Sequence, residues 1–141
     1  MDKIEKSSFR RLLGIWKTNG EMKSGDEDLS INGLDSYELI LDGNFILHKS
    51  EVKIGTQKSE TLEIIRLDKS FDKAIMQFFN SRGENGMMVG TVNNNELQIE
   101  GIGLKFEGCF SDDDKKISGK WYRQSEDKEW VEFIRIKLEK Q

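Results

Sequence analysis

Short apolar or alternating segments recur along the chain at roughly ten-residue intervals, the spacing of strands in all-β proteins. They cover residues 14–23, 37–41, 44–54, 60–67, 71–79, 86–92, 96–103, 104–110, 116–124 and 129–139. Turn-forming residues separate them, among them Asp42-Gly43 and the three asparagines at 93–95. Because a period of two is typical of half-buried strands, the pattern predicts about ten antiparallel strands.

The N-terminal segment departs from this period. In residues 4–13, Ile4, Phe9, Leu12 and Leu13 can share one face of a short helix. Together these elements predict an all-β fold, a closed up-and-down β-barrel with a short N-terminal helix, because closure leaves no bare strand edge. A β-sandwich is the alternative. We expect residues 1–141 to form this one domain.

The Asp42-Gly43 pair predicts a two-residue hairpin turn, which fixes the register of the strands on either side. In this register Tyr37 lies opposite His48. One face of the hairpin carries no formal charge, and we expect it to face the interior, since unpaired buried charges are unfavourable. That face consists of Tyr37, Leu39, Ile46, His48, Ser50 and Val52.

The last hairpin has a longer loop. Pairing Trp121 with Val131 points Arg135 toward the interior and leaves Ile134 and Ile136 facing outward. Arg135 is then a buried cation that needs a partner.

Several short motifs occur in a characteristic order along the chain. They are Gly14-Ile15-Trp16 after the helix, Leu67–Ser70, Ser111–Asp113 and Gly119–Trp121. With an arginine on the last strand, this order resembles the calycin superfamily, and most closely its bacterial lipocalin-like families of unknown function. The resemblance implies that Trp16 closes one end of the barrel and that Arg135 packs across its ring in a cation–π contact.

The chain also differs from better-known members of the superfamily. The threonine-aspartate-tyrosine motif of lipocalins is absent. Fatty-acid-binding proteins use an arginine and a tyrosine two residues apart, whereas this chain has Arg135-Ile136-Lys137. A fatty-acid anchor of that kind is therefore not expected.

The resemblance implies a ligand-binding barrel, and we expect the protein to bind a small, mostly apolar molecule in the barrel interior. Tyr37 and His48 are amphipathic neighbours that could orient a ligand, and the methionines could supply adaptable lining. The alternative is that all of these side chains simply pack in the core. The candidate ligand-binding residues are Tyr37, His48, Ser50, Met76, Phe78, Met87 and Trp121.

Composition and charge limit the classes of binding partner and the cellular compartment that we expect. The net charge of −4 and the scattered basic residues argue against binding to nucleic acid or to anionic membranes. No segment approaches the ~20 apolar residues of a membrane span, and no secretory signal opens the chain. The single cysteine, Cys109, cannot form an internal disulfide, so we expect a cytoplasmic protein. A monomer or weak homodimer is expected.

No motif assigns catalysis. Nucleophile elbows, phosphate loops and dinucleotide fingerprints are absent, and the aspartates at 112–114 lack the spacing of a calcium loop. We therefore expect no metal, no cofactor and no catalytic residue, although dispersed carboxylates leave catalysis open.

Two alternatives to a small-molecule-binding barrel remain. One is a haem-binding barrel enzyme of nitrobindin type. Such an enzyme needs an axial histidine, and His48 is the only histidine in this chain. The other is a filled barrel with a structural or interaction role.

Overall fold

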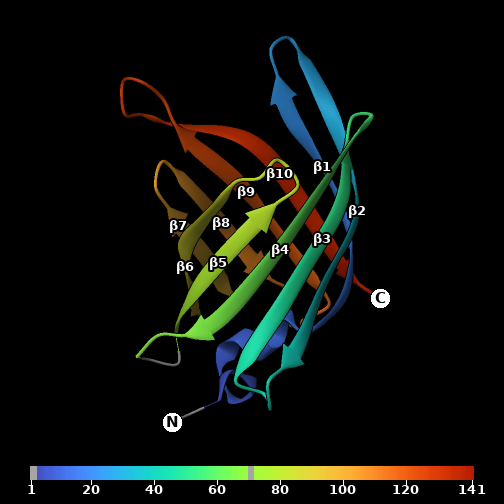
Figure 1. The fold of residues 1–141 in the computed structure, drawn as a ribbon. Helices are drawn as coiled ribbons and strands as arrows, with labels where there is room; N and C mark the ends of the chain where they lie inside the picture. The colour runs from blue at the N-terminus through green and yellow to red at the C-terminus, as the bar shows by residue number, and fades with distance from the viewer. Residues whose placement is uncertain (1–2, 70–71) are drawn as a thin grey trace.

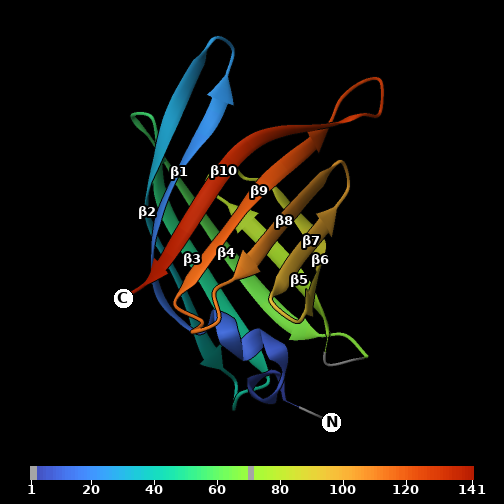
Figure 2. The same ribbon diagram turned by 180° about the vertical axis from the view of Figure 1, so that it is seen from behind.

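The computed structural model describes residues 3–69 and 72–141, and within them ten strands close into one barrel. Each strand pairs antiparallel with its neighbours in the sequence, and β10 closes the barrel against β1 (Figures 1 and 2). The elements are the 3-10 helices η1 (Ile4–Lys6) and η2 (Ser8–Leu12) and the strands β1 (Gly14–Ser24), β2 (Glu27–Ile40), β3 (Phe45–Ile54), β4 (Gln57–Leu67), β5 (Lys73–Asn80), β6 (Asn85–Asn93), β7 (Glu96–Gly101), β8 (Leu104–Phe110), β9 (Lys116–Gln124) and β10 (Trp130–Lys140). The predicted up-and-down barrel is confirmed.

Strand β2 is much longer than the sequence pattern suggested. It begins at Glu27 rather than at residue 37. Leu29 and Ile31 alternate on its inner face, but the next two inner-face positions are Gly33 and Asp35, which interrupt the apolar pattern before Tyr37. Of the predicted features, Ser70 at the end of one motif and Phe71 at the start of another segment lie outside the described residues.

The N-terminal 3-10 helices cover one end of the barrel, the lower end in Figure 1. Ile4, Phe9 and Leu12 are buried there beside Trp16. The Trp16 indole N–H donates a hydrogen bond to the Leu12 carbonyl at 2.7 Å. Gly14 joins this plug to β1 with a φ of 133°, a conformation that L side chains rarely adopt. These buried side chains fill the end of the barrel that the 3-10 helices cover.

The β2–β3 hairpin has the predicted register, with Tyr37 opposite His48. Leu41, Asp42 and Gly43 all have positive φ, and the Asn44 N–H donates a hydrogen bond to the Leu41 carbonyl at 3.3 Å across the turn. Lys3 anchors the turn to the N-terminal segment, because its Nζ lies 2.9 Å from Asp42 Oδ2.

The predicted register of the last hairpin is wrong. Trp121 pairs with Ile134 instead of Val131, and a β-bulge lies between Glu132 and Ile134. The extra residue moves each later side chain of β10 to the face opposite the predicted one. Ile134 therefore lies opposite the inward-facing Trp121, and Arg135 points outward. This arrangement places apolar side chains inside and the guanidinium in water.

Arg135 consequently does not pack on Trp16. Its guanidinium Nε lies 2.9 Å from Glu132 Oε2 on the barrel surface. The cation over the Trp16 ring is instead Lys140, whose Nζ lies 4.8 Å from the ring centroid. Lys140 can do this because it is the direct partner of Trp16 in the β1–β10 ladder.

Candidate functional site

A cluster of polar side chains lies inside the barrel, on the wall formed by β1 to β4. His48 on β3 stands between two carboxylates: its Nε2 is 2.7 Å from Asp35 Oδ1 on β2, and its Nδ1 is 3.0 Å from Glu63 Oε1 on β4. Thr18 on β1 donates its hydroxyl hydrogen to Asp35 Oδ2. Thr18, Asp35 and Glu63 are among the buried polar residues of the described chain.

The geometry indicates that His48 carries a positive charge. A carboxylate only accepts hydrogen bonds, so both ring nitrogens donate, and both donate only in the imidazolium form. Burial alone would lower the pKa of His48, but the hydrogen bonds to Asp35 and Glu63 outweigh it and raise the pKa from 6.5 to about 9. Burial likewise opposes ionisation of Asp35, yet bonds from His48, Thr18 and Ser50 lower the pKa of that carboxyl.

Tyr37 covers the imidazolium. The two rings stack with centroids 4.0 Å apart and planes 8° from parallel, which sets the ring face of the phenol against a cation. Burial and the charges of Asp35 and Glu63 raise the pKa of the Tyr37 hydroxyl well above its usual value. The hydroxyl therefore keeps its proton and remains a hydrogen-bond donor near the cluster.

The other predicted ligand-binding residues separate into three groups. Ser50, Phe78 and Trp121 face inward and are half-buried, as a lining role requires. Met76 also faces inward, but it is buried in the core. Met87 is on the outer face with 55% of its surface exposed, so its expected place in the lining is wrong. Its neighbour Met88 takes the inward position, because alternation along β6 sends adjacent residues to opposite faces.

The two carboxylates of the cluster were not among the residues predicted from the sequence. Asp35 lies two residues before Tyr37, so the inner face assigned to Tyr37 would have included it had β2 been extended upstream. Glu63 is the direct partner of His48 in the β3–β4 ladder. The sequence predicted registers only for the β2–β3 and β9–β10 hairpins, and a glutamate in an alternating segment is usually taken as solvent-facing.

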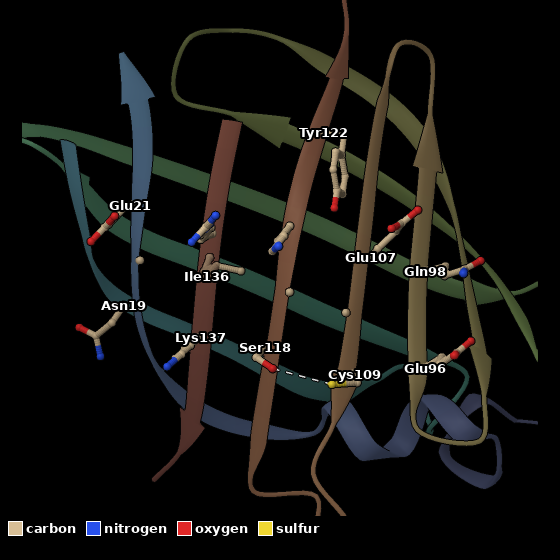
Figure 3. A pocket seen from close by; sticks show the side chains of 15 residues that line it. Asn19, Glu21, Glu96, Gln98, Glu107, Cys109, Ser118, Tyr122, Ile136 and Lys137 are labelled. Atoms are coloured by element: carbon tan, nitrogen blue, oxygen red, sulfur yellow. Dashed lines mark hydrogen bonds between the residues drawn. The ribbon is translucent and has the colours of Figure 1, made fainter. Parts of the chain in front are cut away.

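A second feature is a groove of about 920 Å³ on the outer face of the barrel, across β1, β10, β9, β8 and β7 (Figure 3). Cys109 and Ser118, whose Sγ and Oγ lie 3.8 Å apart, are on its floor. Cys109 is exposed.

The charged side chains around this outer groove have both signs. They are Glu21, Glu96, Glu107, Lys120, Arg135 and Lys137. These side chains lie on the solvent side of the barrel, so water and salt screen them, whereas the interior cluster is shielded. The interior cluster is therefore the stronger candidate site.

The residues present do not fit a histidine-ligated haem. Iron ligation needs an imidazole nitrogen with a free lone pair. His48 is the only histidine, and both of its nitrogens are directed at carboxylate oxygens. Within residues 3–69 and 72–141, no cluster of histidine, cysteine and carboxylate side chains is arranged to hold a metal ion.

Comparison with known proteins supports the fold and assigns no family. No protein-family model matches the chain, and no curated protein sequence does. The crystal structure of Rv2717c from M. tuberculosis is similar over 100% of this chain and 99% of that one, with a TM-score of 0.79 and 13% identity. The S-type phycobiliprotein lyase CPES from Guillardia theta covers 94% of this chain and 89% of its own, with a TM-score of 0.56 and 8% identity.

These identities are low, so the likeness concerns the fold alone: both neighbours share the ten-strand antiparallel barrel, which is compatible with a lipocalin-like calycin fold. In the described part of the chain, no helix has the length and apolar character needed to cross a membrane.

Proposed function

We propose that the barrel binds a small, mostly apolar molecule in its interior, entered from the end opposite the N-terminal plug. The supporting observation is a change in exposure along the inner wall. Trp16, Ile46 and Ile65, near the plug, are fully buried. Val52 and Thr61, toward the other end, face inward but are only half-buried, so solvent reaches them. Ligand sites are concave and mostly apolar with a few convergent polar groups.

The interior offers such a combination. Phe78 and Trp121 supply aromatic surface, and the cluster around His48 supplies polar groups. One structural neighbour with this barrel is a phycobiliprotein lyase, which is consistent with a ligand-binding barrel. We further propose that the chain is a calycin of the bacterial lipocalin-like kind, on the strength of its Gly14-Ile15-Trp16 motif and its plugged barrel. A cytoplasmic monomer or weak homodimer that binds neither nucleic acid nor membrane completes the proposal.

Binding of the neutral fluorescent dye N-phenyl-1-naphthylamine tests interior binding. Thr61→Trp puts an indole into the inner wall near the open end, and we expect it to weaken dye binding by about tenfold or more, because the indole occupies the space the dye needs. Fluorescence titration of wild type and variant measures the effect.

Leu62→Trp is the matched control. Leu62 is the next residue on β4 and points outward with 40% of its surface exposed. It should leave the dye affinity unchanged. If both variants bind as wild type does, the dye lies outside the barrel and the proposal fails. A folded protein that binds no apolar dye favours the filled barrel instead.

A further inference from the structure

One carboxylate oxygen of the cluster inside the barrel, Glu63 Oε2, accepts no hydrogen bond from the described residues. Asp35 uses both oxygens, one for His48 and one for Thr18. Glu63 uses only Oε1, for His48, and no residue in the described part of the chain donates a hydrogen bond to its Oε2. Yet Glu63 is 6% exposed. No fully buried polar side-chain atom of the described residues lacks a partner, so Oε2 is open to the interior rather than sealed.

The net charge at this place is negative. Two carboxylates surround one imidazolium, which leaves one uncompensated negative charge. Among the residues that the structure describes, no lysine or arginine forms an ion pair with Asp35 or Glu63. Charge effects are strongest where water is excluded, and the His48 side chain is only 14% exposed. A positively charged group beside Glu63 Oε2 would be attracted, and a second carboxylate would be repelled.

We propose that the polar end of the bound molecule is a hydrogen-bond donor, with a protonated amine preferred, held by Glu63 Oε2. This rests on the proposed function, because it assigns the polar end of the same ligand. Asp35 and Thr18 are positioning residues that fix His48, and His48 in turn orients Glu63. The Tyr37 ring lies over His48 and gives the ligand an aromatic surface beside the carboxylate. An alkyl carboxylate, the ligand form of a fatty acid, is disfavoured at this site.

Three probes with the same chain and different heads test the preference: decylamine, decanol and decanoate, each below the concentration of micelle formation. Displacement of N-phenyl-1-naphthylamine at pH 7 reports their affinities. We expect decylamine to bind about tenfold or more tightly than decanoate, with decanol between them. Wild-type protein alone suffices for this comparison. Equal affinities, or tighter binding of decanoate, would overturn the proposal.

The variant Glu63→Gln tests whether the Glu63 carboxylate causes the preference for decylamine over decanoate. It keeps the size and one acceptor oxygen but removes the charge, so the ratio of amine to carboxylate affinity should fall close to one while dye affinity is kept. Glu60→Gln is the control, because Glu60 is exposed on the same strand and should leave the ratio unchanged. A ratio that survives Glu63→Gln contradicts the assignment to Oε2.

Failure of the proposed function gives a different result. In that case Thr61→Trp leaves the dye and decylamine bound as in wild type, which places both outside the barrel whatever the order of the head groups.

Discussion

Trp16→Ala is expected to lower the free energy of unfolding by roughly 3–5 kcal/mol, the range for truncating large aromatic side chains in cores. Trp16 is fully buried at the plugged end, where it packs with Phe9 and Leu12. Its indole N–H also satisfies the Leu12 carbonyl, so the variant both opens a cavity and removes a buried hydrogen bond. Urea unfolding followed by circular dichroism measures the change.

Two substitutions serve as controls. Trp130→Ala removes a tryptophan that is 41% exposed, and it should cost roughly 1 kcal/mol or less, mainly its contact with Lys105. Arg135→Met removes an exposed ion pair and should leave the unfolding midpoint close to that of wild type. A Trp16→Ala midpoint equal to that of either control would refute the plug. A large loss in Arg135→Met would contradict the outward placement of Arg135.

The fold was predictable because it depends on features that repeat. Alternation and turn residues marked most strands, and β8 and β9 have the predicted bounds. The Asp42-Gly43 turn predicted the β2–β3 register, since only two central residues have to be placed. The β9–β10 register could not be predicted from local sequence patterns. Its loop is longer, and the bulge after Glu132 adds a residue that no local pattern marks.

The candidate site was only half predictable for a related reason. Tyr37 and His48 follow from one hairpin, whereas the cluster needs side chains from four consecutive strands. The assumption that charges avoid the interior correctly directed Lys49 outward. The same assumption concealed Asp35 and Glu63, because each becomes acceptable in the interior only once His48 is known to lie between them.

Wild-type stability is expected to fall as pH rises from about 6.5 to about 9, the interval between the ordinary pKa of His48 and its raised pKa in the folded protein. In this interval the folded state holds the His48 proton and the unfolded state has lost it, so a rise in pH favours unfolding. The stabilisation is fully present below pH 6.5 and is lost above pH 9. Its size is roughly 3 kcal/mol, from about 1.4 kcal/mol per pKa unit. Urea unfolding at pH 6 and at about pH 9.5 measures it.

Because His48 is the only histidine, no other histidine contributes to the pH dependence or to the imidazole NMR signals. The C–H signals of its ring can be followed by NMR in the folded protein, where the pKa should be about 9, and again in urea, where it should return to about 6.5. Cys109→Ser removes the exposed thiol and should retain the pH dependence, whereas His48→Gln should abolish it. A folded-state pKa near 6.5 would mean that Asp35 and Glu63 do not hold the ring as an imidazolium. The interior would then carry two uncompensated negative charges at neutral pH, and burying them together would be strongly unfavourable. The ring titration therefore tests the charge on which the amine preference depends, without any added ligand.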